Sequence, residues 1–65
     1  MRMQKYTIKA ARIRAGFTQR EVAHKLHMNV QTFMRIENGK SYFRINSAAK
    51  FADIVGIDFD NIIFF

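Results

Sequence analysis

The stretch TQREVAHKLHMNVQTFMRIENGK, residues 18–40, contains two short segments with apolar residues at helical spacing, joined by only a few residues. Thr18 and Glu21 have the spacing of a capping box, and Asn29 is a typical N-cap for the second segment. A connection this short forces two helices to cross at a steep angle. The small Ala23 then lies where they come closest, and the inward-facing residues are Val22, Leu26, Met28, Phe33 and Ile36. This pattern predicts a helix-turn-helix unit over about residues 18–38.

The rest of the chain predicts helices on both sides of this unit. Gly16, Gly39 and Gly56 each follow a helix-like stretch, where a left-handed residue commonly ends a helix. The expected helices begin at Thr7 or a neighbour, Thr18, Asn29, Asn46 and, for a short last helix, Asp58. Because no long alternating pattern is present, we expect an all-α fold, a compact five-helix bundle forming one domain over residues 1–65.

The composition excludes several classes of protein. The chain has 65 residues, enough for one domain and too few for an added ligand-sensing or catalytic domain. It has no Cys, which excludes disulfides and thiolate metal sites and fits a reducing cytoplasm. It also has no apolar run of about 18 residues, so we expect no membrane span, and the start lacks the pattern of a secretory signal.

The charge is distributed unevenly along the chain. Residues 1–50 contain all eleven Lys and Arg residues and two of the five acidic residues, for a net charge of +9. Residues 51–65 contain three Asp residues and no base, for a net charge of −3. This asymmetry favours a polyanion as the partner of the N-terminal part. The alternative is that the charge serves only solubility.

The sequence around the helix-turn-helix stretch resembles the phage repressor and Cro family, also called the XRE family. The resemblance covers roughly residues 7–64 and depends most on Arg12, the G-x-T-Q pattern of residues 16–19, Ala23 and IENGK at residues 36–40. It implies a lambda-repressor-like DNA-binding domain in a cytoplasmic protein. The chain departs from the family at His27, where Gly is usual, and near Phe43, where Pro is common. A left-handed His27 would cost about 1 kcal/mol.

The second helix of the unit carries the residues expected to read bases. If Phe33 and Ile36 face the core, a polar pair and an apolar pair lie on the opposite side. Gln can bind adenine, Arg can bind guanine, and an apolar side chain can contact a thymine methyl group. The resemblance adds Asn29 at the leading edge. The candidates are Asn29, Val30, Gln31, Met34 and Arg35, with a protein interface or the core as the alternative for Val30 and Met34.

Other polar residues are expected at the DNA backbone. The resemblance implies that Gln19, at the start of its helix, contacts a phosphate, and that the loop after the second helix lies along the backbone. The phosphate candidates are Gln19, Arg20, Thr32, Lys40, Ser41, Tyr42 and Arg44, with Arg2 and Lys5 as further candidates unless they form a solvated tail. The resemblance also implies a structural ion pair between Arg12 and Glu37.

The acidic C-terminal end, residues 51–65, is rich in apolar residues. Two short helices cannot turn all of them inward, and an exposed apolar patch usually marks an interface. The candidate residues for a dimer surface are Ile54, Ile62, Ile63, Phe64 and Phe65. A twofold dimer would present two reading helices to a near-palindromic site. The alternative is that the terminal Phe residues close a small core.

No pattern in the chain indicates catalysis. Glu21, His24 and His27 lack an evident further ligand, the His-Glu-x-x-His pattern is absent, and there is no Gly-rich phosphate loop. We therefore expect no enzyme, metal, cofactor or small-molecule ligand. The sequence predicts a Cro-like repressor that binds double-stranded DNA as a homodimer. The alternative is a protein-interaction or antitoxin-type module for which DNA binding is secondary.

Overall fold

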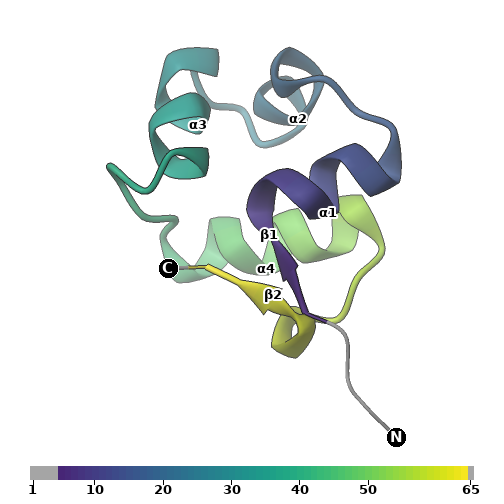
Figure 1. Ribbon diagram of the computed structural model, residues 1–65. Helices are drawn as coiled ribbons and strands as arrows, with labels where there is room; N and C mark the ends of the chain where they lie inside the picture. The colour runs from purple at the N-terminus through teal and green to yellow at the C-terminus, as the bar shows by residue number, and fades with distance from the viewer. Residues whose placement is uncertain (1–4, 65) are drawn as a thin grey trace, which may run out of the picture.

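The computed structural model describes residues 5–64, which form four α-helices, one 3₁₀ turn and two very short strands. The order is β1 (Tyr6–Thr7), α1 (Ile8–Ala15), α2 (Gln19–Lys25), α3 (Val30–Glu37), α4 (Ile45–Val55), the 3₁₀ turn η1 (Phe59–Asn61) and β2 (Ile62–Ile63). Figure 1 shows α2 and α3 together at one end, with α1, α4 and the strand pair below them. The mostly helical fold and the helix-turn-helix unit agree with the prediction.

The first three helices begin at residues whose side chains cap them. Thr7 Oγ1 accepts the Ala10 N–H at 3.0 Å, and Asn29 Oδ1 accepts the Gln31 N–H at 2.7 Å. At α2, Thr18 Oγ1 accepts the Glu21 N–H at 3.0 Å, and Glu21 Oε1 accepts the Thr18 N–H at 2.8 Å. Each bond satisfies a backbone donor that the first turn of a helix leaves without a partner. The predicted starts are therefore confirmed for α1, α2 and α3.

The helices are followed by left-handed residues at the predicted positions. Gly16, Gly39 and Gly56 have φ angles of 84°, 81° and 69°, and His27 has a φ of 56°. The left-handed turn at His27 lets the Met28 N–H reach the Ala23 carbonyl at 3.0 Å. This bond closes the end of α2 just before α3 begins. The turn thus has the shape expected for the motif, although a non-glycine residue forms it.

Two predictions about the C-terminal half are wrong. Helix α4 begins at Ile45 rather than at Asn46, with Arg44 at the N-cap and no side-chain capping bond among the described residues. The expected fifth helix is the single 3₁₀ turn η1, because the chain becomes extended at Ile62 with a ψ of 133°. The bundle therefore has four α-helices within residues 5–64 rather than five.

The extended residues after η1 pair with the start of the described chain. Strands β1 and β2 run parallel, with Tyr6 opposite Ile62 and Thr7 opposite Ile63. Beside them, Lys5 Nζ donates to the Asp60 carbonyl at 3.2 Å. A ladder of two residues is too short to produce an alternating pattern, so the sequence did not predict it. The strand pair thus joins the beginning and the end of the described chain, below the helix-turn-helix unit in Figure 1.

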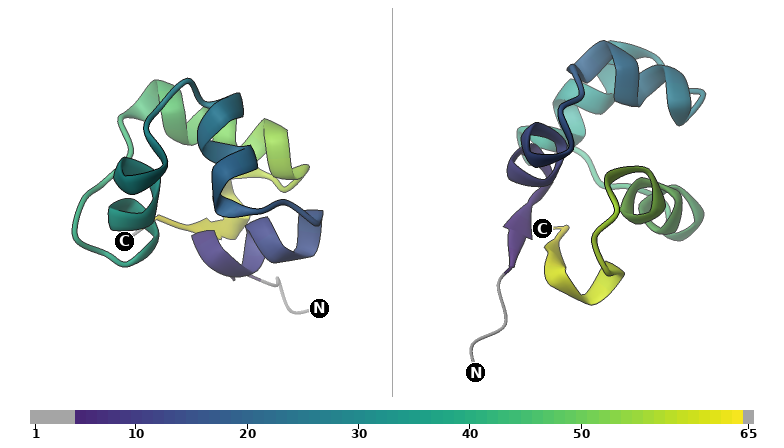
Figure 2. Two further views of the ribbon diagram at one scale, coloured as in Figure 1. Left: turned by 90° about the horizontal axis from the view of Figure 1, so that it is seen from above. Right: turned by 90° about the vertical axis from the view of Figure 1, so that its right-hand side faces the viewer.

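The core lies between α1 and α4, with α2 and α3 above it and the strand pair below, as the right-hand view of Figure 2 shows. Phe33, Phe51 and Val22 are its largest fully buried side chains. Phe43, in the loop after α3, folds back so that its ring lies 5.4 Å from that of Phe51 and 6.2 Å from that of Phe33. The buried apolar set is Ile8, Ala11, Val22, Ala23, Leu26, Phe33, Ile36, Ala48, Phe51, Ala52, Val55, Ile57 and Ile62.

Candidate nucleic-acid interface

Helix α3 has one buried face and one exposed face. Phe33 and Ile36 are buried at 0% and 5% exposure, whereas Gln31 and Arg35 are exposed. Met34, at 38% exposure, lies beside them on the outer face. Two polar side chains and one flexible apolar side chain are therefore accessible on a helix whose other face is fixed in the core.

Three further α3 candidates have mixed positions. Val30 is half-buried and packs against the core, because it lies three residues before Phe33 and shares a helix face with it. The prediction that it lies on the outer face is therefore wrong in part. Asn29 is exposed, and its Oδ1 caps α3 while no hydrogen bond of its amide nitrogen is seen within residues 5–64. Thr32 is exposed one position after Gln31.

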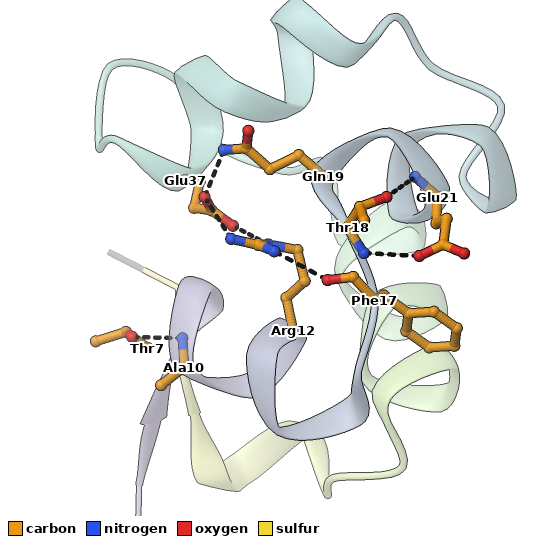
Figure 3. Close-up of polar contacts among 8 residues, drawn as sticks. All are labelled: Thr7, Ala10, Arg12, Phe17, Thr18, Gln19, Glu21 and Glu37. Carbon is orange, nitrogen blue, oxygen red and sulfur yellow. Dashed lines mark hydrogen bonds and ion pairs between the residues drawn. The ribbon is translucent and has the colours of Figure 1, made fainter.

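A buried carboxylate holds the C-terminal end of α3. Arg12 Nε donates to Glu37 Oε2 at 2.7 Å, and their side chains are 11% and 3% exposed. Gln19 Nε2 donates to Glu37 Oε1 at 2.7 Å, as Figure 3 shows. Arg12 Nη1 also donates to the Phe17 carbonyl at 2.9 Å. We call Arg12, Gln19 and Glu37 the polar hub, because they join α1, α2 and α3 at one carboxylate.

The predicted phosphate candidates are not all equally accessible. Arg20, Lys40, Tyr42 and Arg44 are exposed, while Ser41 is half-buried. Gln19 is half-buried and its amide nitrogen is bonded to Glu37, a contact that no spacing in the sequence indicated. The Lys40 N–H donates to the Arg35 carbonyl at 2.8 Å, which fixes the start of the loop against α3. Exposed cations thus lie at the start of α2 and in the loop after α3.

Other basic residues lie against aromatic rings or the strand pair. The Arg14 guanidinium carbon lies 5.5 Å from the centre of the Tyr6 ring, and Lys25 Nζ lies 5.2 Å from that of Phe17. Lys5 is bonded to the Asp60 carbonyl beside the strands. Arg2 lies outside the described residues. Lys5, a further phosphate candidate, therefore lies at the strand pair rather than beside α3.

The capping box of α2 also affects the ionisation of Glu21. The Thr18 backbone N–H, and after it the Thr18 side chain, lower the pKa of Glu21 below its ordinary value. A hydrogen bond to a carboxylate favours its charged form. A negative charge in the first turn of α2 also lies favourably toward the helix dipole. The start of α2 is thus most strongly capped when Glu21 is ionised.

An apolar groove lies beside the loop that follows α3. It has a volume of about 460 Å³ and is lined by Tyr42, Phe43, Ile45, Ala48, Phe59 and Phe64. Three of these side chains are well exposed for apolar residues: Ile45 at 78%, Tyr42 at 66% and Phe59 at 43%. Sequence reasoning missed this groove. Its signal was the run YFRI in a connection between helices, in which Phe43 packs against the core while Tyr42 and Ile45 remain exposed.

Three residues of the predicted dimer surface pack within the fold instead. Ile62 is buried at 6% because it pairs with Tyr6 beneath the core, and Ile54 and Phe64 pack partly against that core. The prediction that these residues form a surface is therefore wrong for Ile62. Ile63 is 43% exposed. Phe65 lies outside the described residues.

Residues 5–64 contain neither a candidate metal site nor a helix that could span a membrane. Within this range no group of His, Asp and Glu side chains has an arrangement that could hold a metal ion. No helix in the same part of the chain is long and apolar enough to cross a membrane.

Comparison with protein families gives one match, a helix-turn-helix domain over residues 7–61. The matched region includes α1 to α4 and η1. Comparisons with curated proteins and with solved structures give no match.

Proposed function

The chain belongs to the helix-turn-helix domain family, and we propose that it is a regulator of transcription that binds double-stranded DNA at a specific sequence. The outer face of α3 carries this proposal. Gln31, Met34 and Arg35 are exposed there, while the inner face is anchored by Phe33 and Ile36. The face is accessible and its backbone is fixed, which are the two conditions for reading base edges with a helix.

The three exposed side chains match the chemistry of the major groove. The Arg35 guanidinium can donate two hydrogen bonds to the O6 and N7 atoms of guanine. The Gln31 amide can pair in the same manner with N6 and N7 of adenine, and the Met34 side chain can contact a thymine methyl group. We expect these residues to determine which sequence is bound.

Cations on both sides of α3 would position the helix on the backbone. Arg20 is in the first turn of α2, and Lys40 and Arg44 lie in the loop after α3; all three are exposed. Contacts to phosphates add affinity without distinguishing sequences, and their strength falls as salt rises. The acidic residues Asp58 and Asp60 belong to the opposite, C-terminal part of the chain.

We further propose that the protein represses transcription as a Cro-like dimer, with a second copy of the chain seated on the apolar groove. In the sequence, the exposed Arg44 lies between the groove residues Phe43 and Ile45, and the exposed Asp58 and Asp60 flank the groove residue Phe59. A twofold axis through the groove would bring Arg44 of one copy toward Asp58 and Asp60 of the other. This self-complementary charge favours a second copy over nucleic acid as the occupant.

DNA selection from a random pool tests the main proposal. We expect one enriched motif whose binding survives about 0.2 M salt, where contacts to phosphates alone are weak. Arg35→Ala should cost about 1–3 kcal/mol and relax the preference at one base position. Lys40→Ala, the control, should weaken all sequences alike and reduce the salt slope by about 1. A pool that shows no enrichment would argue against sequence-specific binding.

Sedimentation equilibrium tests the dimer. Ile45→Ser changes a side chain that is 78% exposed in the groove, so it should shift the native dimer to monomer without unfolding the domain. Ile13→Ser is the matched control, because Ile13 is 57% exposed on α1 and does not line the groove. A native monomer at tens of micromolar, or equal effects of the two variants, would contradict the dimer.

A further inference from the structure

We infer that Gln19 is a positioning residue for α3, which acts on base recognition through Glu37 rather than through a phosphate contact alone. The inference deepens the proposed function and depends on it for the part that concerns DNA. It starts from the polar hub, where the Gln19 amide on α2 and the Arg12 guanidinium on α1 meet the same carboxylate at the end of α3.

Glu37 needs donors because of its position. Its side chain is 3% exposed, so its charge has little contact with water. It is also the last residue of α3, where the partial negative charge of the helix end disfavours a carboxylate. Arg12 supplies the opposite charge at 2.7 Å and a longer second bond at 3.4 Å. Gln19 supplies a neutral donor at 2.7 Å to the oxygen that Arg12 contacts less closely.

The two donors constrain different motions of α3. Arg12 comes from α1 and also holds the Phe17 carbonyl, so it fixes α3 to the layer beneath it. Gln19 comes from the first turn of α2 and fixes the distance between that turn and the end of α3. Apolar packing between the helices is not directional, whereas hydrogen bonds within a satisfied buried network favour one arrangement. Gln19 thus determines how α3 is oriented relative to α2.

This orientation matters because Arg35 lies two residues before Glu37 on the same short helix. A small rotation of α3 moves Arg35 and Gln31 relative to any base edge, while the exposed cations Arg20 and Lys40 can still reach phosphates. Loss of the Gln19 contact should therefore weaken binding to the selected sequence more than binding to random DNA. A residue that only contacts a phosphate would weaken both by the same factor.

The test compares Gln19→Met with Arg20→Met, a neighbouring variant on an exposed residue of the same turn. Gln19→Met keeps the length of the side chain and removes the donor to Glu37. We expect it to reduce the ratio of specific to random-sequence affinity by about tenfold. Arg20→Met should leave that ratio unchanged within about twofold and reduce the salt slope by about 1. Equal loss of specific and random binding in Gln19→Met would overturn the inference.

A second measurement needs no DNA. In amide NMR spectra of the protein alone, Gln19→Met should shift resonances across α3 and leave those of α4 in place. Spectra in which α3 is unchanged would also overturn the inference. If the native chain selects no DNA sequence, the proposed function fails, and this measurement alone decides whether Gln19 positions α3.

A double-mutant cycle tests whether Gln19 acts on α3 through Glu37. In the Glu37→Met background, Gln19→Met should have no further effect on the α3 resonances or on the affinity ratio, because the oxygen that accepts the Gln19 hydrogen bond is already absent. Independent effects of the two substitutions would show that Gln19 acts by another route. Should Glu37→Met fail to fold, the Gln19→Met variant and its α3 spectrum remain decisive.

Discussion

Residues 7–37 are joined by directional polar contacts, whereas residues 43–64 are joined largely by aromatic rings. The first region contains three side-chain caps and the polar hub. In the second, Phe43 and Phe51 each contact Phe64, at ring distances of 6.0 and 6.4 Å, and Phe59 lies 4.8 Å from Phe64. Helix α4 begins without a side-chain cap within the described residues.

The difference between the two regions fits the proposed function. Base reading requires a fixed orientation of α3, and hydrogen bonds with set lengths and angles provide one. Ring packing fills volume and tolerates several arrangements, which suits a support for α3 and an apolar groove open to another chain. Substitutions in the first region should therefore alter the geometry of α3, and substitutions in the second should lower stability with less effect on that geometry.

Arg12→Ala should produce the largest effect. It leaves the buried Glu37 carboxylate without its cation, and breaking a buried pair from one side costs about 3–5 kcal/mol. Urea unfolding followed by circular dichroism measures this loss. Arg14→Ala is the control, because Arg14 is exposed and lies over Tyr6, a contact worth about 0.5–1 kcal/mol. A native midpoint for Arg12→Ala would mean that the hub does not hold α1 to α3.

Phe43→Ala should have the next largest effect. Phe43 is half-buried and its ring lies near those of Phe33, Phe51 and Phe64. Full burial of a Phe makes its loss cost about 3–5 kcal/mol, so we expect about half of that here. Phe59→Ala, at 43% exposure, should cost about 1 kcal/mol or less. The same unfolding assay compares them.

Phe43→Ala also tests the contrast between the regions. The ratio of specific to random-sequence affinity should fall less for the folded Phe43→Ala variant than for Gln19→Met, although Phe43→Ala loses more stability. The opposite order would show that ring packing, rather than the polar hub, determines the orientation of α3.

Local signals in the sequence predicted the first region well. The pairs Thr18 with Glu21 and Asn29 with Gln31 are close in sequence, so cap and helix start can be recognised together. The ion pair between Arg12 and Glu37 was implied by the family resemblance, since nothing local relates residues so far apart. The exposed face of α3 followed from its apolar spacing, apart from Val30.

The second region was harder to predict because its contacts depend on distant residues. The pairing of Tyr6 with Ile62 has no periodic signal at a length of two residues per strand. That pairing converts the expected fifth helix into η1 and buries Ile62. The bond from Gln19 to Glu37 likewise depends on the crossing of α2 and α3, which a sequence specifies only in outline.

His27→Gly should stabilise the turn between α2 and α3 slightly. His27 has a φ of 56°, a region that costs a residue with a β-carbon about 1 kcal/mol and costs glycine almost nothing. We expect a gain of up to about 1 kcal/mol in the unfolding free energy, reduced by the greater freedom of glycine in the unfolded chain. The control, His24→Gly, lies within α2 and should lose about 1 kcal/mol. A loss for both variants would mean that the His27 side chain stabilises the turn.

The smallest effect concerns the pH dependence of the α2 cap. The Thr18 N–H lowers the pKa of Glu21 in the folded state, so the unfolded chain binds a proton at this site more readily than the folded one. The resulting stability is complete above the pKa of the unfolded chain and is lost as the pH falls through the lower, folded-state value. Glu21→Gln keeps an oxygen that can accept the Thr18 N–H but cannot titrate. Unfolding midpoints measured from pH 6 down to about pH 3 should therefore fall less steeply for Glu21→Gln than for the native chain. Parallel curves would mean that the acid sensitivity of this domain arises from other carboxylates, and that the cap of α2 contributes equally in both protonation states.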